Sequence, residues 1–514
     1  MLNLSIILET SARRFPDKTA FIFGDTRLTY ADLDAAAGKV ANALLVNGIA
    51  PGDKVALTCP NLPYFPIIFF GILKAGAVVV PLSLLLKQDE IAYHLADCGA
   101  KVYFCFVGSN ELPTGKMGHA AFCETECCTQ FIVIMPTPER DSPIDGISTF
   151  AELIAEQSTE IEPFQSGAED TCLIIYTSGT TGKPKGAELT HSNLLLNAIV
   201  CADFLETSPN DTQLIVLPLF HVFALTVLML AGVYRGTTNV LLARFDAAAV
   251  FGAMREHAVT LFAGVPTMYW ALLNYDAEEN DIFSVSKNLR IAASGGASLP
   301  LTVLEGFEKR FGVEIYEGYG MSEGSPVVSF NQKAFGRKPG SVGTAVWGVD
   351  VKIVDPDGNE VPTGEKGELL YRGHNVMKGY HNRPEATAET IRDGWLHSGD
   401  IAIKDEDGFF FIVDRTKDLI IRGGMNVYPR EVEEAMIKHE AVSLVAVIGV
   451  PDEKMGEEVK AVVVLKEKNS ITPSELMDWT KDRIAAYKCP RHIEFVEALP
   501  MSATGKILKK DLRN

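Results

Sequence analysis

The sequence predicts an α/β protein with a large N-terminal domain and a small C-terminal domain. Before Ser341, apolar runs typical of strands alternate with amphipathic helical patterns, which favours layered α/β subdomains built on mostly parallel sheets. After Ser341, short strands and turns follow one another directly and indicate a β-rich subdomain. The chain has 514 residues, more than one hydrophobic core usually supports, so two or more domains are expected.

The first elements follow from the spacing of apolar residues. We expect helices at 30–45 and 91–95, and strands at 55–58, 78–80 and 102–106. The stretch 62–86 is very apolar, but Lys74 and several prolines and glycines interrupt it. It therefore predicts a buried helix at 64–75 and a buried strand at 77–81 rather than a membrane span. Residues 136–146 are rich in Pro, Asp and Gly and predict a surface loop.

The later elements define the second half of the chain. In the β-rich subdomain we expect strands at 351–354 and 367–372, with a turn at 355–358 between them. A hinge is expected at 414–418, between strands at 409–413 and 419–421. The remaining segment predicts helices at 429–438 and 473–485 and strands at 445–450 and 460–465, which is enough for a small α+β domain. We place the domains at 1–414 and 415–514.

The composition excludes several classes of protein. The chain is 47% hydrophobic and 22% charged, as expected for a folded protein, and its net charge of -19 disfavours a partner such as nucleic acid or an anionic membrane. No CxxC pair occurs among the nine cysteines, and the group Cys123, Cys127 and Cys128 has an irregular spacing for zinc. Because Glu9, Arg13 and Arg14 interrupt the first apolar run, no secretory signal is predicted. We expect a cytoplasmic protein with reduced thiols.

The segment 176–186 has the composition of a phosphate-binding loop. It reads Tyr-Thr-Ser-Gly-Thr-Thr-Gly-Lys-Pro-Lys-Gly and follows an apolar run at 172–175 that predicts a strand. Glycines let the backbone approach an anion, and the freed N–H groups, hydroxyls and lysines can hold phosphates. It is not a Walker motif, because Gly179 and Gly182 are too close together and Pro184 follows Lys183. A flexible linker, the alternative, would not combine so many hydroxyls with two lysines.

Six segments in this order resemble motifs of the adenylate-forming superfamily, which includes acyl-CoA synthetases, coumarate–CoA ligases, luciferases and the adenylation domains of peptide synthetases. Besides the phosphate loop, these are Gly295-Gly-Ala-Ser298, Tyr319-Gly-Met-Ser-Glu323, Ser398-Gly-Asp400, Asp414-Arg415 and Gly505-Lys506. The resemblance covers essentially the whole chain and is greatest to fatty acyl-CoA ligases. One departure is Ser322, where the family usually has Thr.

The resemblance implies a site for ATP and AMP. Tyr319 would stack on adenine, Asp400 and Arg415 would bind the ribose hydroxyls, and the phosphate loop would hold the phosphates. The implied set is Thr177, Ser178, Gly179, Thr180, Thr181, Lys185, Gly296, Ala297, Ser298, Glu317, Gly318, Tyr319, Asp400, Ile412 and Arg415.

The resemblance also implies catalytic roles for Lys506, Ser322, Glu323 and His221. Lys506 would contact the reacting carboxylate and the α-phosphate, where positive charge offsets repulsion and stabilises the transition state. Ser322 would bind the α-phosphate, and Glu323 would hold Mg²⁺, which usually takes only one or two protein carboxylates. His221 would act as a gate beside the acyl carboxylate, although a lone histidine in an apolar run is more often a core residue. Lys509 and Lys510 are expected to be solvated.

The acyl pocket and the coenzyme A side are implied in the same way. The matching pocket residues are Phe223, Val227, Gly295, Gly320, Gly324, Pro326 and Val327. The segments 223–227 and 324–329 contain no Arg or Lys for a second carboxylate and no Asp for an amino group, so an apolar acid is expected. The C-terminal domain would rotate between two half-reactions about Lys417 and bring Gly423, Gly424 and Asn426 to the active site in the second.

These implications together predict an acid–CoA ligase. It would use ATP, Mg²⁺ and coenzyme A to convert a carboxylic acid into acyl-AMP and then acyl-CoA. Medium- and long-chain fatty acids are the first expectation for the acid, and aryl-alkanoic acids such as cinnamates are the alternative. A monomer or a homodimer is expected, and a fatty substrate leaves peripheral membrane contact open.

Other functions remain as alternatives. A fatty acyl-AMP ligase would pass the acyl group to a carrier protein; such proteins usually carry an insertion, and none is evident between Asp400 and Asp418. A luciferase-like oxidation and a non-catalytic nucleotide-binding protein are more remote. Residues 318–324 also match GxGxxxG, but a dinucleotide fingerprint belongs near the start of a βαβ unit with an acidic residue about twenty positions later, where Lys338-Pro339-Gly340 stands here.

Overall fold

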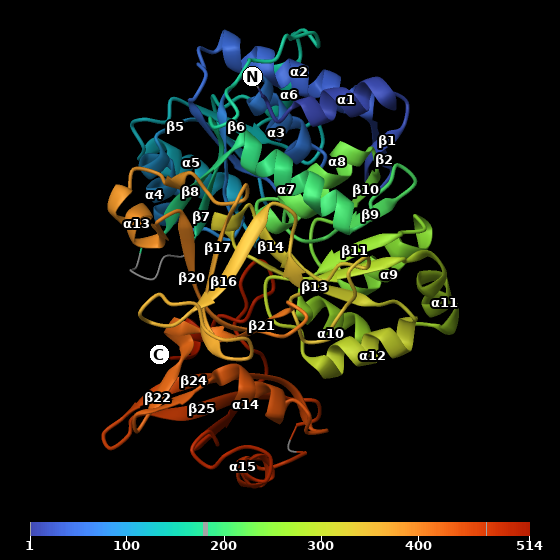
Figure 1. The fold of residues 1–514 in the computed structure, drawn as a ribbon. Helices are drawn as coiled ribbons and strands as arrows, with labels where there is room; N and C mark the ends of the chain where they lie inside the picture. Colours follow the sequence, from blue (N-terminus) through green and yellow to red (C-terminus); the bar gives the residue numbers. More distant parts are fainter. Residues whose placement is uncertain (1, 178–182, 469, 514) are drawn as a thin grey trace.

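A computed structural model describes residues 2–177, 183–468 and 470–513 and has a mixed α/β fold. A large N-terminal domain occupies the upper part of Figure 1, and a small domain formed by the last residues hangs below it. Four sheets organise the chain, three in the large domain and one in the small domain. In the part of the chain that the structure describes, no helix combines the length and apolar character needed to cross a membrane.

The first sheet has nine strands, in the order β15-β14-β13-β12-β11-β9-β10-β1-β2. Its central strands from β13 to β1 are parallel, whereas β2, β14 and β15 are antiparallel additions at the two edges. The bounds are β1 Thr19–Phe23, β2 Thr26–Thr29, β9 Thr212–Ile215, β10 Thr238–Leu241, β11 Leu261–Gly264, β12 Ile291–Ser294, β13 Ile315–Gly320, β14 Val327–Phe330 and β15 Thr344–Ala345.

The second sheet has seven strands, in the order β18-β8-β7-β4-β3-β5-β6. Its strands from β7 to β6 are parallel and almost entirely apolar, as expected for strands buried on both faces. The bounds are β3 Lys54–Thr58, β4 Val78–Pro81, β5 Ala100–Phe106, β6 Gln130–Ile134, β7 Thr171–Thr177, β8 Lys185–Thr190 and β18 Gly379–Tyr380.

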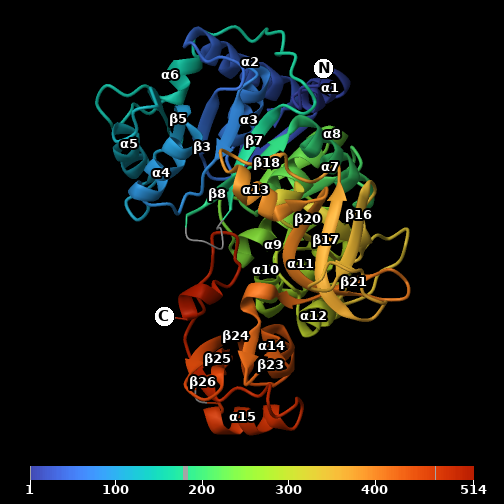
Figure 2. The same cartoon turned by 60° about the vertical axis from the view of Figure 1, so that its left-hand side comes forward.

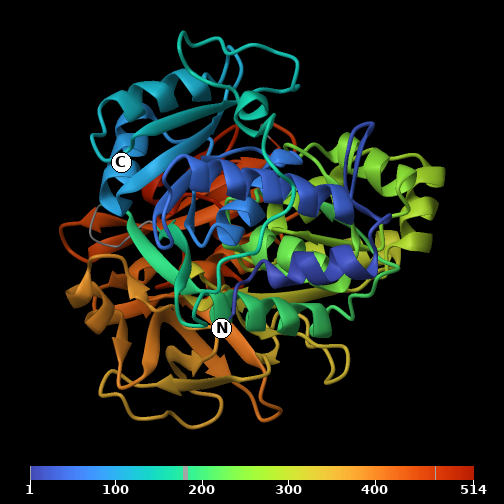
Figure 3. The same cartoon turned by 90° about the horizontal axis from the view of Figure 1, so that it is seen from above.

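Helices cover these sheets, and several begin at a polar cap. The hydroxyl of Thr29 accepts from the backbone N–H of Asp32 at the start of α2, and Thr190 caps α7 through Asn193. From above, the blue and green helices form a layer across the molecule (Figure 3). The bounds are α1 Ile6–Arg14, α2 Tyr30–Val46, α3 Tyr64–Lys74, α4 Gln88–Cys98, α5 Thr114–Cys123, α6 Phe150–Ile154, α7 His191–Phe204, the π-helix η1 Phe223–Leu230, α8 Ala231–Arg235, α9 Ala247–Glu256, α10 Pro266–Asn274, α11 Glu279–Asn288 and α12 Leu301–Phe311.

The β-rich subdomain forms the third sheet, with the order β16-β17-β20-β19 and β21 paired to β20. All its pairings are antiparallel. Asn193 of α7 anchors the chain that follows β17, because its side-chain amide donates to the carbonyls of His374 and Val376. The bounds are β16 Val349–Val354, β17 Lys366–Gly373, α13 Pro384–Thr390, β19 Ile391–Arg392, β20 Trp395–Lys404 and β21 Phe410–Arg415, and the short helix η2 (Ser322–Gly324) lies between β13 and β14.

The small domain has its own sheet, ordered β23-β22-β25-β24 with β26 paired to β25. The last residues then turn back toward the large domain, and Figure 2 shows this red segment rising to the level of α10. The bounds are η3 Thr416–Asp418, β22 Ile420–Arg422, β23 Met425–Val427, α14 Pro429–Met436, β24 Val442–Asp452, β25 Gly456–Leu465, α15 Pro473–Lys481, β26 His492–Phe495 and η4 Lys509–Leu512.

The two parts of the chain are built around separate hydrophobic cores. One cluster runs through the first three sheets, from Leu4 to Phe410. A second, smaller cluster lies inside the small domain and joins Ile420, Val432 and Leu476. This separation agrees with the predicted fold class, a large layered domain followed by a small α+β domain.

The expected elements match the observed ones closely, with differences at their ends. The helix expected at 64–75 is α3, and the strand expected at 77–81 is β4. The helix expected at 473–485 ends earlier, at Lys481, because the chain continues in turns from Thr480. Strands β24 and β25 extend beyond the predicted ranges 445–450 and 460–465. The π-helix η1 was not predicted, because its uniformly apolar sequence has no periodicity that distinguishes helix types.

Candidate active site

The predicted site residues gather where the carboxyl ends of β12 and β13 meet the β-rich subdomain and the end of the chain. Loops at the carboxyl ends of parallel strands are a usual place for a ligand in an open α/β sheet.

Lys506 lies in a tight hairpin whose tip touches the large domain. The N–H of Ser502 donates to the carbonyl of Lys506 (2.8 Å), and the hydroxyl of Ser502 accepts from the N–H of Lys506 (3.1 Å). The hydroxyl of Thr267, at the start of α10, donates to the carbonyl of Gly505 (2.9 Å). Burial, with the charges of Arg415 and Lys417 nearby, lowers the pKa of Lys506 to about 8.

His221 lies close enough to Lys506 to feel its charge. Burial is the larger cause and the lysine charge the smaller in lowering the pKa of His221 to about 4. The imidazole is therefore neutral at neutral pH. Its Nδ1 accepts from the N–H of Phe223 (3.3 Å), which assigns the proton to Nε2.

Asp400, Tyr319 and Arg415 form a second cluster beside the lysine. The hydroxyl of Tyr319 donates to Oδ2 of Asp400 (2.5 Å), and Nε of Arg415 lies 3.2 Å from Oδ1. Asp400 is only 5% exposed, and these two partners satisfy its buried carboxylate oxygens. Burial and this carboxylate raise the pKa of Tyr319 well above its usual value, which keeps the hydroxyl protonated and able to donate.

Glu323 lies on η2 and faces the ends of β7 and β8. Its Oε1 accepts from the hydroxyls of Tyr380 (2.8 Å) and Thr177 (3.2 Å). Among the described residues, Oε2 accepts no hydrogen bond. The ammonium of Lys185 lies 4.5 Å from the ring centroid of Tyr380. The two stems of the phosphate loop therefore meet near Glu323, Thr177 by a direct hydrogen bond and Lys185 through its contact with Tyr380. Ser178, Gly179, Thr180 and Thr181 lie outside the described residues.

The loop that follows β12 forms another edge of the site. Gly296 and Ala297 are exposed and Ser298 is half-buried. Behind the loop, Oε1 of Glu317 accepts from the N–H of Leu299 (3.1 Å). Its Oε2 is buried with no hydrogen-bond partner among the described residues. Burial is the main cause of the raised pKa of Glu317, about 7. Glu317 thus supports the loop from behind.

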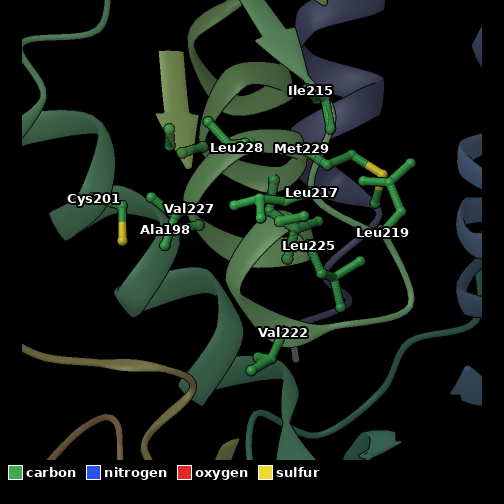
Figure 4. Packing of buried hydrophobic residues seen from close by; sticks show 14 of the residues in the cluster. Ala198, Cys201, Ile215, Leu217, Leu219, Val222, Leu225, Val227, Leu228 and Met229 are labelled. Carbon is green, nitrogen blue, oxygen red and sulfur yellow. The ribbon is translucent and has the colours of Figure 1, made fainter. Parts of the chain in front are cut away.

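The acyl-pocket residues come from η1 and from the hairpin of β13 and β14. A Cβ placed on Gly295 would lie 3.3 Å from the ring of Phe223, and this glycine also stands beside the carbonyl of Gly318. Val227 is 2% exposed and belongs to the packed core, where η1 contacts α7. Figure 4 shows Val227 with Ala198 and Cys201, the α7 side chains beside it. The ring of Phe223 therefore packs close to Gly295, and the helix behind it is closely packed.

The opposite wall, from Gly320 to Val327, is held by buried amides. A Cβ on Gly320 would lie 1.9 Å from the carbonyl oxygen of Pro326, so the two strands approach too closely for any larger residue. Asn197 of α7 donates to the carbonyl of Val327 (3.0 Å) and accepts from its N–H (3.2 Å). Gly324 is buried and faces the hydroxyl of Tyr371.

The hinge and the loop predicted for the coenzyme A side lie on the small-domain side. The hinge residue Lys417 is in η3. Two other predicted residues belong to the large domain: Ile412 is half-buried in β21, and Ser322 is half-buried in η2. Gly423, Gly424 and Asn426 are exposed in the hairpin of β22 and β23. Gly423 contacts Met455 of the same domain, so this loop is not part of the cluster around Lys506 in the present arrangement.

One expectation about the C-terminal tail is wrong. Lys509 is not free in solvent: it is half-buried, and its ammonium lies 2.8 Å from Glu433 of α14. Because the tail folds back on α14 and the hinge residue Asp414, a basic run that looks exposed in sequence becomes partly internal. Lys510 is exposed as expected.

Three residues that contact the site were not predicted: Tyr380, Thr267 and Asn197. Each acts through a partner far away in the chain, with sequence separations of 57, 238 and 130 residues. None belongs to a glycine-rich or charged motif.

Comparison with known proteins identifies relatives of the whole chain. Residues 8–381 match the family described as AMP-binding enzyme, and residues 431–506 match the AMP-binding enzyme C-terminal domain. The chain is 40% identical over 503 residues to a feruloyl-CoA synthase of an Amycolatopsis species, covering 98% of this chain and 96% of that protein. It is 39% identical over 531 residues to a long-chain-fatty-acid–CoA ligase of Bacillus subtilis (strain 168), covering 99% and 94%.

Solved structures show the same relationship. An anthranilate CoA ligase in complex with anthranoyl-AMP has a TM-score of 0.90 at 31% identity and covers 99% of this chain and 96% of its own. ATP-bound MatB from Rhodopseudomonas palustris has a TM-score of 0.89 at 30% identity, covering 100% and 98%. The apo structure of the same MatB has a TM-score of 0.79 at 31% identity with the same coverage.

Proposed function

The chain belongs to the AMP-binding enzyme family and is an acid–CoA ligase that acts through an acyl-AMP, and we propose that its acid substrate is an apolar monocarboxylic acid. The observation that carries the proposed site is the position of Lys506. A residue from the end of the chain lies half-buried beside His221, Asp400 and Arg415 of distant segments. A partly desolvated ammonium there is suited to two anions that must approach each other.

We propose that the structure corresponds to the adenylating arrangement of the two domains. The chain superposes better on ATP-bound MatB than on apo MatB, with TM-scores of 0.89 and 0.79 at nearly equal identity. Lys506 is then in place for the first half-reaction. The acid carboxylate attacks the α-phosphate of ATP, pyrophosphate leaves, and the ammonium offsets charge at the α-phosphate.

In the same half-reaction the large domain would hold the nucleotide. Tyr319 would stack on adenine, while Asp400 and Arg415 bind the ribose hydroxyls. Thr177, Lys185 and the rest of the phosphate loop would bind the phosphates, with Ser322 at the α-phosphate. Gly296, Ala297 and Ser298 would lie along the adenine, supported by Glu317 from behind. His221, held neutral by burial, would border the reacting carboxylate as a gate rather than as a base.

The hydrogen bonds around Glu323 leave one of its carboxylate oxygens available to a magnesium ion. Two hydroxyls donate to Oε1, which leaves Oε2 as the oxygen that can coordinate. A single carboxylate beside phosphates is a usual protein contribution to Mg²⁺ binding. When bound, the ion neutralises charge on the ATP phosphates. The residues of this chain orient the carboxylate for that purpose, through Tyr380 and Thr177.

For the acid, medium- and long-chain fatty acids are the first candidate. The predicted walls carry apolar side chains and no Arg or Lys for a second carboxylate. The relative from Bacillus subtilis, a long-chain-fatty-acid–CoA ligase, supports this substrate class.

Aryl acids are the second candidate, favoured by the aromatic side chain of Phe223. Its half-buried ring packs close to Gly295, and Val227 behind it is packed against α7. An aromatic ring at this position is suited to stack on a planar conjugated acid. The relative named feruloyl-CoA synthase supports this candidate.

The second half-reaction would use the other face of the small domain. We place the domain boundary at Asp414 and Arg415 and the pivot at Lys417. Rotation there would remove Lys506 and bring Gly423, Gly424 and Asn426 to the site, where the CoA thiol attacks the acyl-adenylate and AMP leaves.

The experiment is to measure pyrophosphate release from MgATP with octanoate, palmitate, cinnamate and ferulate, with and without CoA. Sustained turnover with CoA that rises from octanoate to palmitate supports the fatty-acid candidate, and a maximum with cinnamate or ferulate supports the aryl candidate. Release that CoA does not stimulate would indicate a carrier-protein acceptor. Absence of release with every acid would refute the proposed apolar substrate.

A further inference from the structure

Among the described residues, Thr267 makes the hydrogen bond that joins the lysine hairpin to α10. Its hydroxyl donates to the carbonyl of Gly505, 2.9 Å away, the residue directly before Lys506. A Cβ on Gly505 would lie 3.0 Å from this hydroxyl and 3.1 Å from Val265, and Gly505 has φ +79. The backbone therefore approaches the start of α10 as closely as a glycine allows.

The hairpin is stiff enough to transmit this contact to the lysine. Gly505 donates its N–H to the carbonyl of Ser502 (2.9 Å), and Ser502 donates to the carbonyl of Lys506 (2.8 Å). The hydroxyls of Ser502 and Thr504 are 2.8 Å apart, and Met501 bridges to Ile507. A hydrogen bond that fixes Gly505 in this turn therefore also restrains the next residue, Lys506.

In the described parts of the chain, the other hydrogen bonds and ion pairs between the domains lie at the hinge. Arg430 of α14 donates its N–H to Asp414 (3.0 Å), and Arg415 pairs with Asp400. Among the residues that the structure describes, the bond of Thr267 is the hydrogen bond farthest in sequence from the hinge that joins the two domains. Contacts at the hinge restrain the residues about which the small domain would turn. The bond of Thr267 instead restrains the hairpin that carries Lys506.

We propose that Thr267 is a positioning residue that latches Lys506 in the active site during adenylation and plays no part in thioester formation. This inference rests on the proposed function, because it assigns Lys506 to the first half-reaction. The hydroxyl does not touch the reacting atoms. It acts by favouring the arrangement in which the lysine is in place, and it is released when the small domain rotates.

The consequence is an asymmetry between the half-reactions. One neutral hydrogen bond changes an equilibrium by about three- to tenfold. Losing it reduces the fraction of molecules with Lys506 in place by that factor, so acyl-AMP formation slows. Thioester formation from supplied acyl-AMP does not require the latch and keeps its rate or increases.

The experiment compares Thr267→Val, which removes only the hydroxyl, with Thr267→Ser, which keeps it. Thr302→Val is the matched control, because Thr302 also occupies the second residue of a helix, α12, but is exposed. Acyl-AMP formation is measured in single turnovers with MgATP and the preferred acid. Thioester formation is measured from synthetic acyl-AMP and CoA, and thermal unfolding checks the fold of each variant.

We expect Thr267→Val to slow acyl-AMP formation about three- to tenfold, with thioester formation not reduced and Thr267→Ser near the wild-type rate. Equal loss in both half-reactions, no loss in either, or the same loss in Thr302→Val would overturn the latch. Wild-type protein that forms no acyl-AMP would instead refute the proposed function, so the two failures are distinguishable.

Discussion

The large domain and the small domain of this protein differ in how they hold their functional groups. In the large domain, Glu323, Asp400 and Asn197 are buried, and each makes two polar contacts with other segments of the chain. In the small domain, the lysine is carried on one hairpin that meets α10 through a single hydrogen bond. The first region is fixed by its surroundings, and the second is attached to a separate core.

This difference indicates a division of labour. Binding surfaces for a nucleotide gain from rigidity, because preorganised groups lose little freedom when the ligand binds. A charge needed in one half-reaction only must be removable, so it belongs on a unit with its own core and few contacts. The predictions below test the division, beginning with the change expected to have the largest effect.

Replacing Lys506 with Ala tests whether the small domain contributes mainly this charge. We expect acyl-AMP formation to fall about 10²- to 10³-fold, as when one transition-state donor is removed. Thioester formation from supplied acyl-AMP should remain, since the large domain still holds the adenylate. The neighbouring Lys510→Ala, exposed in the structure, is the control. Loss of both half-reactions would show that the lysine supports more than adenylation.

Replacing Glu458 with Gln tests whether the small domain folds around its own core. Arg422 and Glu458 form a two-pronged ion pair at 2.7 and 2.6 Å, and both are under 9% exposed. Leaving the guanidinium unpaired should cost the small domain ~3–5 kcal/mol. Calorimetry should show that the small domain unfolds at a lower temperature while the unfolding temperature of the large domain is unchanged. Glu497→Gln, in an exposed pair with Lys468, should move neither.

Replacing Tyr380 with Phe tests the rigid support in the large domain. The hydroxyl donates to Glu323, so its loss should raise the Mg²⁺ concentration for half-maximal acyl-AMP formation by about tenfold. Tyr234→Phe, at a half-buried position away from Glu323, is the control. An unchanged magnesium requirement would show that Tyr380 does not support magnesium binding.

The pH dependence should differ between the half-reactions. Because the pKa of Lys506 is lowered to about 8, its ammonium is charged below that pH and neutral above it. We expect kcat/KM for acyl-AMP formation to fall as pH rises above about 8, by up to tenfold per unit. Thioester formation from acyl-AMP should lack this limb. A shared alkaline limb would assign it to a group of the large domain.

The smallest effect is expected at a contact between the domains. The ammonium of Lys366 lies 4.0 Å from the ring centroid of Tyr428, across the boundary. Removing this cation–π contact by Lys366→Ala should slow acyl-AMP formation by about two- to fivefold. Lys352→Ala is matched, because Lys352 lies over Trp395 within the large domain at 4.4 Å. An equal effect in both would mean that the contact has no role in domain arrangement.

Much of the fold was predictable because it depends on neighbours in the chain. The buried strands β3, β4 and β5 follow from short apolar runs, and α3 follows from an apolar segment bounded by proline and glycine. The ends of elements were less accurate. Helix α4 begins at Gln88 and ends at Cys98, because polar residues on its exposed side extend it beyond the apolar face.

By itself the sequence determined the order of the motifs, the two-domain plan and the residues that we predict to bind phosphate, ribose and a cation. Each of these is set by residue type at short spacing. Only the tertiary structure decided which partners those residues have. Tyr380 on Glu323, Thr267 on Gly505 and Lys509 on Glu433 are contacts between segments far apart in the chain. No local pattern encodes them, because they depend on how sheets and helices pack.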